Sequence, residues 1–299
     1  MDLSDIQKQL DKIMFERNNS PIPEFEGYSP NEMHQILHFT FGPKSPIQLQ
    51  KLSDDEYRKI PILNQIKYLA DVISRKGELK LTTKGFLPVK VVSDLYGQGY
   101  LTDYPIEKGI VKLYKEKDSM TVHLTRLLVE LSGIVKKRNG KMSLTKNGEK
   151  LVSDNDKLLR TLFEVFGTKL NWAYFDGYGD NSIGQLGYGF TLILLSKYGN
   201  KEHRDFFYAG KYFEAFPRLM DVIESSYGSL DEYAAKCYSL RTFNRFLDYF
   251  GLIEIKTEGI WIDSIQYITK SDLFDKFVKC LPHKVSKNEV TIKHENTRN

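Results

Sequence analysis

Apolar residues recur at intervals of three and four along most of the chain, a spacing typical of amphipathic helices. Residues 3–17 show it first, with Asp and Lys residues on the opposite face. Ser29 followed by Pro30 predicts the start of a second helix, because Ser is a favoured N-cap and Pro fits the first turn. Ser229 and Ser239 are expected to cap two later helices in the same way. The other helices are expected from residue 53 and over residues 62–74, 88–96, 119–132, 158–166, 203–216, 217–226 and 269–277, and the two capped by serine over 230–237 and 240–250.

Short strands interrupt these helices. Asn139 and Gly140 lie between two runs of strand-like residues, and Asn-Gly is typical of a two-residue hairpin turn because both residues must take positive φ. A second hairpin is expected over residues 252–268, with its turn at 257–259, and residues 79–81 form a further short strand. The sequence therefore predicts a mainly α protein with small β-hairpins.

Two stretches of the chain can be laid over each other, each consisting of a helix, a hairpin and a further helix. Residues 126–135 correspond to residues 245–254, and residues 144–148 after the first hairpin correspond to residues 268–272 after the second. Residues 81–85 are a partial third copy. Because internal self-similarity indicates a repeated supersecondary unit, we expect tandem units behind an N-terminal helical arm.

The repeated unit resembles the winged helix-turn-helix, over residues 88–152 and again over residues 227–277. The resemblance implies that the helix before each hairpin is a recognition helix and that the hairpin is a wing. The chain as a whole is also similar to bacterial proteins without an assigned function. The expected division is an N-terminal helical arm at 1–59, a first winged-helix-like domain at 60–152, a second helical or winged-helix-like domain at 153–280, and a flexible tail at 281–299.

The resemblance also implies which side chains would meet double-stranded DNA. Thr121 and His123 should point outward from the first recognition helix, and Thr242 from the second. Cations of the first wing would contact phosphates, whereas Arg and Asn of the recognition helices are suited to the edges of guanine and adenine. The expected nucleic-acid-binding residues are Thr125, Arg126, Lys136, Lys137, Arg138, Lys141, Arg241, Asn244 and Arg245.

Charge changes this picture locally rather than globally. The net charge of +4 is too small to require nucleic acid by itself. Residues 107–152, however, hold eleven Lys or Arg and five acidic residues, a local charge of +6. The second wing, at 257–259, has no basic residue, which weakens the expectation of DNA contact there. Basic residues at a hairpin tip also serve solubility and protect a sheet edge, so the charge alone does not decide between the two roles.

The sequence gives less support to catalysis or metal binding than to the winged-helix resemblance. His34 and His38 lie on one helix face at chelating spacing, but a zinc-protease motif would need Glu beside the first His, and no third ligand is near. The glycine-rich residues 177–189 lack the Gly-Lys-Ser/Thr of a phosphate loop. Asp176 and Asp180 could pair for acid-base work, but carboxylates in a turn usually cap backbone groups, which is the role expected here. We predict neither a cofactor nor a metal, and an enzyme is the third alternative, with a site at the glycine-rich segment or the His helix.

Composition indicates an intracellular protein. The longest apolar run, residues 190–195, is too short to cross a bilayer, and residues 1–5 do not look like a secretory signal. The two cysteines are isolated, which favours a reducing compartment, so a cytoplasmic location without membrane contact is expected. The favoured function is a DNA-binding, regulatory module. The alternative is a protein-interaction scaffold in which the same wings and helices bind a partner protein.

Overall fold

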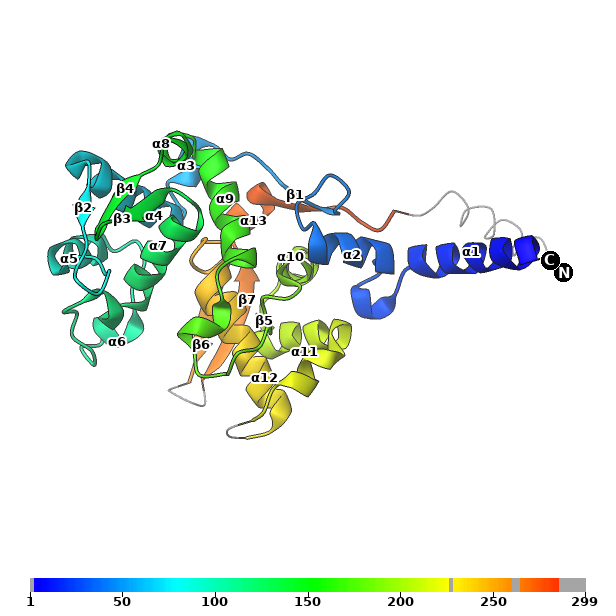
Figure 1. Cartoon of the computed structure of the whole chain (residues 1–299). Coiled ribbons are helices and arrows are strands. Elements are labelled where there is room, and N and C mark those ends of the chain that lie inside the picture. Colours follow the sequence, from blue (N-terminus) through cyan, green and yellow to red (C-terminus); the bar gives the residue numbers. More distant parts are fainter. Residues whose placement is uncertain (1–2, 226–227, 260–263, 285–299) are drawn as a thin grey trace.

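The computed structural model describes residues 3–225, 228–259 and 264–284. It confirms a mainly α protein, and the strands of this part of the chain form small antiparallel sheets (Figure 1). In the described residues, no helix is both long and apolar enough to cross a membrane.

A first unit runs from helix to hairpin in the left half of Figure 1. Its strands pair in the order β2-β4-β3, all antiparallel. Two short pieces, α6 (Tyr104–Glu107) and η2 (Glu116–Asp118), connect its second and third helices. Its elements are α4 (Pro61–Lys76), β2 (Leu79–Lys80), α5 (Val89–Tyr96), α7 (Met120–Leu131), β3 (Val135–Arg138), β4 (Lys141–Leu144) and α8 (Lys146–Val152).

A second unit repeats the same succession. Its strands pair in the order β5-β7-β6, which matches the order of the first sheet position by position. The two units are therefore alike over more of the chain than the sequence repeat covers. Each unit also begins with a helix, a short strand and a second helix, which come before the stretches that are similar in sequence. Its elements are α10 (Tyr188–Tyr198), β5 (His203–Arg204), α11 (Asp205–Ala215), α12 (Leu230–Ser239), the π-helix η5 (Leu240–Leu247), β6 (Ile253–Glu258), β7 (Ile265–Lys270) and α13 (Asp272–Phe277).

The remaining elements join the two units. Helix α9 (Asn155–Thr168) lies between them in Figure 1. A two-stranded sheet pairs β1 (Ile47–Leu49) with β8 (Val278–Cys280) and so links the N-terminal part of the chain to its C-terminal part. The others are α1 (Leu3–Asn19), η1 (Pro23–Phe25), α2 (Pro30–His38), α3 (Asp54–Tyr57), η3 (Trp172–Phe175) and η4 (Pro217–Val222).

Local sequence signals placed several elements correctly. Ser29 caps α2, and Glu32 completes a capping box with it. Between β3 and β4, Asn139 has φ 50° and Gly140 has φ 69°, the positive values that this hairpin turn requires. The tip of the second hairpin, at residues 260–263, lies outside the described residues.

Other expectations were wrong. Ser239 is not an N-cap: its own φ is −58°, α12 continues directly into η5, and the Ser239 hydroxyl donates to Asp205 Oδ2 at 2.6 Å. The last helix begins at Asp272 rather than at Thr269, which lies in β7. Helix α10 was missed because eight consecutive residues of it are buried, so that it has no polar face to produce a periodic pattern.

Most of the expected tail, residues 285–299, lies outside the described residues. Its first residues are held in place. The Leu281 N–H donates to the Pro46 carbonyl at 2.8 Å, and the Tyr28 hydroxyl donates to the Leu281 carbonyl at 2.6 Å. His283 Nδ1 lies 2.5 Å from Glu32 Oε2.

Aromatic side chains of α9 connect the two units. Phe163 stacks on Phe246 at 4.9 Å between ring centroids and meets Phe250 edge-on at 4.8 Å, and Phe166 stacks on Phe246 at 5.1 Å. The buried apolar side chains of both units belong to one continuous cluster. The division into separate domains stays a prediction, because the units share this core.

We predict that Phe163→Ala lowers the free energy of unfolding of the whole chain by about 3–5 kcal/mol, the usual cost of removing a buried Phe. Because the core is shared, urea unfolding followed by circular dichroism should show one transition, shifted to lower urea. Phe39→Ala is the matched control, since Phe39 is 57% exposed, and its midpoint should not move. Two separate transitions in the wild type would contradict a shared core.

Candidate nucleic-acid interface

The three-stranded sheet of the first unit carries a row of cations. Lys141 of the central strand β4 is the Cα partner of Arg138 on β3 and of Lys80 on β2. Residues paired across antiparallel strands lie on the same face, and residues two apart in a strand share a face, so Lys136 lies there too. We call these four residues, Lys80, Lys136, Arg138 and Lys141, the cationic sheet face.

The opposite face of the sheet packs on the core. Leu79 and Met142, which are Cα partners on this face, are 2% and 0% exposed, whereas all four members of the cationic sheet face are exposed. Lys137 pairs in register with Met142, so it is on the core side, where its ammonium lies 3.5 Å from Glu130. Because successive side chains of a strand point to opposite faces of the sheet, Lys137 is separated from the other cations of the wing.

Few carboxylates compete for the cationic sheet face. Lys141 Nζ donates to Glu78 Oε2 at 2.6 Å, and this hydrogen bond together with the lysine's charge lowers the pKa of Glu78. Both side chains are about half exposed, so the pair is screened by solvent and salt. Within the described part of the chain, no carboxylate lies at ion-pair distance from Lys136 or Arg138.

The helix expected to read bases does not face solvent. Thr121, His123, Thr125 and Arg126 of α7 are all buried, so the expectation that they point outward was wrong. Gln65 of α4 donates to Thr125 Oγ1 at 2.7 Å, which fixes the threonine inside the unit. An amphipathic pattern marks these residues as polar, but it does not distinguish a polar residue in water from one in a buried hydrogen-bond network.

Glu116 organises that network. It is 1% exposed, accepts from the Leu87 N–H at 2.6 Å, and lies 2.6 Å from both His123 Nδ1 and Arg126 Nε. Arg126 Nη1 also donates to Glu130 at 2.5 Å. Burial alone would raise the pKa of Glu116, but the hydrogen bonds from His123, Arg126 and Leu87 outweigh burial and lower it. Arg126 therefore neutralises a buried carboxylate inside the unit.

In the second unit, Arg241 has a similar internal role. Its side chain is fully buried and holds Asp176 with two hydrogen bonds, from Nε at 2.7 Å and from Nη2 at 3.0 Å. Arg241 also donates to Asn181 Oδ1 and to the carbonyls of Asn181, Gly179 and Ile183 at 2.8–3.3 Å. These contacts bind the glycine-rich residues 177–189 to η5. Asp176 also caps backbone, as the sequence indicated, by accepting from the Tyr178 N–H at 3.0 Å.

Thr242 is also buried, and Asn244 and Arg245 are half-buried. Arg245 Nε and Nη1 are buried without a hydrogen-bond partner in the described residues, and Nη1 lies 3.8 Å from Asp176 Oδ2. Burial lowers the pKa of Arg245. The expectation of an outward position was therefore also wrong for Arg241 and Thr242, whereas contact of Asn244 and Arg245 with DNA stays a prediction.

Parts of the two third helices also face each other across a small cavity. Met120 and Leu124 of α7 line a small cavity of about 20 Å³ together with Arg241 and Arg245 of η5, with Trp172 on its wall. This volume holds about one water molecule. Arg241 and Arg245 of the second unit thus lie at the contact between the units, whereas Thr125 and Arg126 of α7 are held by Gln65 and Glu116 within the first unit.

The second hairpin carries no comparable charge. Lys256 of β6 lies 2.7 Å from Glu258 and 3.8 Å from Glu202, which neutralise it. A cationic surface on a hairpin is therefore found on the first unit, in the described residues, and not on the second.

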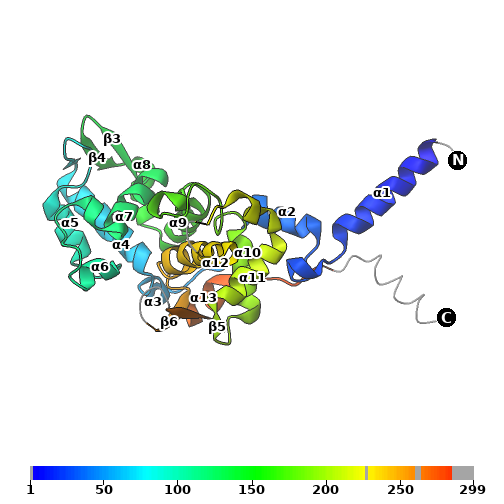
Figure 2. The same cartoon turned by 90° about the horizontal axis from the view of Figure 1, so that it is seen from below.

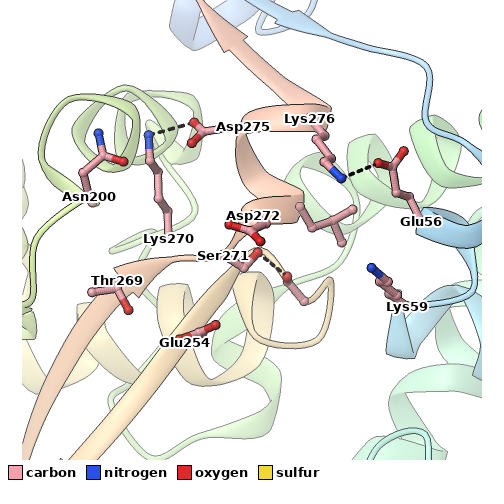
Figure 3. A pocket seen from close by; sticks show the side chains of 13 residues that line it. Glu56, Lys59, Asn200, Glu254, Thr269, Lys270, Ser271, Asp272, Asp275 and Lys276 are labelled. Atoms are coloured by element: carbon pink, nitrogen blue, oxygen red, sulfur yellow. Dashed lines mark hydrogen bonds and ion pairs between the residues drawn. The ribbon is translucent and has the colours of Figure 1, made fainter.

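A polar hollow of about 540 Å³ lies at the start of α13 (Figure 3). Two of its lysines are paired with carboxylates, since Lys270 lies 2.7 Å from Asp275 and Lys276 lies 2.8 Å from Glu56. None of its described lining residues has a buried polar side-chain atom without a partner. Nothing in this hollow selects a substrate or an ion.

The two histidines at chelating spacing lie together on α2. His34 and His38 lie close, with ring centroids 4.6 Å apart, but no group of three potential metal-ligating side chains occurs among the residues that the structure describes. Cys237 is buried and Cys280 is half-buried, and burial raises the pKa of both thiols, to about 12 and about 11. Neither cysteine is therefore an activated nucleophile.

One family of known proteins is similar to the first unit. The family model named Y4jL N-terminal domain matches residues 58–157, from just before α4 to the first turn of α9. The match covers a third of the chain and coincides with the unit that carries the cationic sheet face. No curated protein and no solved structure shows significant similarity to the chain.

We predict that Glu116→Gln lowers the free energy of unfolding by about 3–5 kcal/mol at pH 7, because it leaves the charge of Arg126 buried without its main partner. The folded-state pKa of Glu116 is below the value of 4.5 that is usual for Glu, so the stabilisation is complete above that pH and is lost as the pH falls through the folded-state pKa. Urea unfolding at several pH values should therefore show the wild type and the variant converging in acid.

Glu78→Gln is the control, since it also removes a carboxylate from a cation, but at the surface. Its unfolding midpoint should match the wild type at pH 7. An equal loss of stability in both variants would show that burial of Glu116 is not what matters.

Proposed function

We propose that the chain binds nucleic acid through phosphate contacts at the cationic sheet face of its first unit. The observation that carries the proposal is the register of the sheet, which sets Lys80, Lys141 and Arg138 abreast across three strands. Neighbouring strands are about 4.8 Å apart, so the row spans about 10 Å on an exposed, solvated surface. Lys and Arg side chains in such a row can contact successive phosphates of a nucleic-acid backbone.

The topology of the unit gives further support. Helix, strand, two helices and a hairpin follow one another, with the strand order β2-β4-β3, and the hairpin bears the exposed cations. This arrangement is in keeping with the resemblance to a winged helix-turn-helix, in which the wing contacts the backbone of DNA. The matching family model covers the same unit, although its name states no function.

The proposed mode of binding differs from that of a sequence-specific regulator. The polar residues of α7, and Arg241 of the second unit, are buried in internal hydrogen bonds, so the contacts proposed here go to phosphates and carry no sequence information. Binding should then be independent of sequence and strongly dependent on salt. With three phosphates neutralised, affinity should fall roughly 40-fold between about 50 and 200 mM salt, from a slope near 0.9 per phosphate.

The test is fluorescence anisotropy on random-sequence duplex DNA at about 50 and 200 mM salt, the range in which phosphate contacts have a large effect. The triple variant Lys80→Ala, Arg138→Ala, Lys141→Ala should bind at least tenfold more weakly at low salt and should lose most of the salt dependence. Its control is the triple variant Lys44→Ala, Lys51→Ala, Lys169→Ala, which removes the same charge from exposed positions elsewhere.

The control variant should bind like the wild type. An equal loss in both triple variants would show that net charge rather than the row is responsible. Absence of wild-type binding at 50 mM salt would overturn the proposal.

A second candidate, docking of a partner protein, is favoured by one feature of the first unit. Between α5 and α7, Tyr104, Ile110 and Tyr114 are 68%, 62% and 64% exposed, more than is usual for large apolar side chains. If a partner covers this segment, hydrogen exchange at residues 104–114 should slow when the purified chain is placed in cell extract. Unchanged exchange there, with slower exchange in residues 135–144 on addition of DNA, would favour nucleic-acid binding instead.

A further inference from the structure

Helix α1 has no covering structure. None of its 17 residues is buried, and the helix extends away from the rest of the molecule in both views (Figures 1 and 2). Only its last two residues, Asn18 and Asn19, are partly covered. Asn31 of α2 donates to Asn19 there at 3.0 Å, which fixes the C-terminal end of α1 on the body of the protein.

The exposed side of α1 carries a regular apolar stripe. Leu3, Ile6, Leu10 and Ile13 follow one another at spacings of three, four and three, which is the a/d spacing of a coiled coil. They are 83%, 40%, 49% and 59% exposed. The next position of the same seam is Arg17.

An exposed stripe of this size is unfavourable in water. Together with Met14, which lies beside the seam, the four seam residues expose roughly 500 Å² of apolar surface, within the range of the largest patch on ordinary monomers. A helix of this length is also only marginally stable without tertiary contacts. Among the described residues nothing packs on the stripe, so a partner is needed to cover it.

The charges of α1 indicate what kind of partner fits. Asp5, Asp11 and Glu16 balance Lys8, Lys12 and Arg17, so the helix has no net charge to attract nucleic acid or an anionic membrane. Lys12 lies 3.9 Å from Glu16 and Gln7 donates to Asp11 at 2.7 Å, so that polar groups are paired within the helix. Because the seam is apolar and regularly spaced and the helix has no net charge, the best fit for one α1 is a second copy of α1.

We propose that α1 pairs with α1 of a second copy of this chain in an antiparallel coiled coil and makes the protein a dimer. In this register Leu3 meets Ile13 of the second copy, and Ile6 meets Leu10. A parallel pair would bring the two Arg17 guanidinium groups together in the seam, whereas the antiparallel pair places each beyond the partner helix. The antiparallel pair also keeps the two bodies apart, because each body is joined to the C-terminal end of its own α1. In this register the two Asn19 ends lie about 33 Å apart along the helix axis. This inference does not depend on the proposed nucleic-acid binding.

Light scattering after size-exclusion chromatography of the full chain, at about 1 to 100 µM, tests the dimer. The wild type should have twice the mass of the chain, and the variant Leu10→Asp, Ile13→Asp should have the mass of the monomer. Since α1 contributes no buried residue, the thermal midpoint of the body should be the same in the variant. Ser4→Asp with Lys8→Gln is the matched control: it changes the charge by the same amount on the outer side of the helix and should remain dimeric.

A monomeric wild type at every concentration, or an Asp variant that stays dimeric, would overturn the proposal. Orientation is tested by oxidative cross-linking in a Cys280→Ser background, with Cys237 buried. Mixed Leu3→Cys and Ile13→Cys chains should form the disulfide-linked heterodimer, and neither alone should form a homodimer. Homodimers of each single variant would show a parallel pair and exclude the register proposed here.

Discussion

Packing of α9 between the two units is the interaction on which the other features depend. Phe163 and Phe166 extend from this one helix into the aromatic group of Phe246 and Phe250, so that the second unit is attached to the helix that directly follows the first. Aromatic pairs in offset or edge-on geometry stabilise such contacts beyond their buried area. Because α9 joins both units in this way, their third helices come to lie on either side of the same small cavity.

Burial of the third helices determines where the charged residues go. A buried charge costs several kcal/mol unless it is paired and hydrogen-bonded. The chain meets this requirement with one Arg–carboxylate group in each unit, Arg126 with Glu116 and Arg241 with Asp176. Arg245 is the exception, because two of its nitrogens lack a hydrogen-bond partner in the described residues. Consequently the buried arginines of α7 and η5 do not add to the exposed charge, and alternation along β3 and β4 places Lys136, Arg138 and Lys141 on one exposed face.

The features that the sequence predicted correctly are those determined by neighbouring residues. The Ser29 cap and the Asn139-Gly140 turn depend on the conformation of a few adjacent residues, and both could be placed from the sequence. The exposed cations of the wing follow from the same local pattern. Helix α10 was missed because it is buried on all sides, and β5 because a two-residue strand has no pattern of its own.

The site itself needed long-range information. The row on the cationic sheet face includes Lys80, whose pairing with Lys141 joins residues 61 positions apart, and no local pattern specifies that register. The expectation for α7 failed for the same reason. Thr125 and Arg126 look like surface residues in the sequence, and only the partners Gln65 and Glu116 from other elements explain why they are inside.

These constraints also bear on whether DNA could open the molecule and reach the buried helices. A ligand can shift such an equilibrium only by the difference between its affinities for the two states. Specific binding is typically about 4–10 kcal/mol tighter than non-specific binding. Exposing the four phenylalanines around α9 would cost about 6–12 kcal/mol in hydrophobic free energy alone, and the Arg241–Asp176 pair would be broken as well. For the nucleic-acid binding proposed above, backbone contact at the closed molecule is therefore the mode that agrees better with how the core is built.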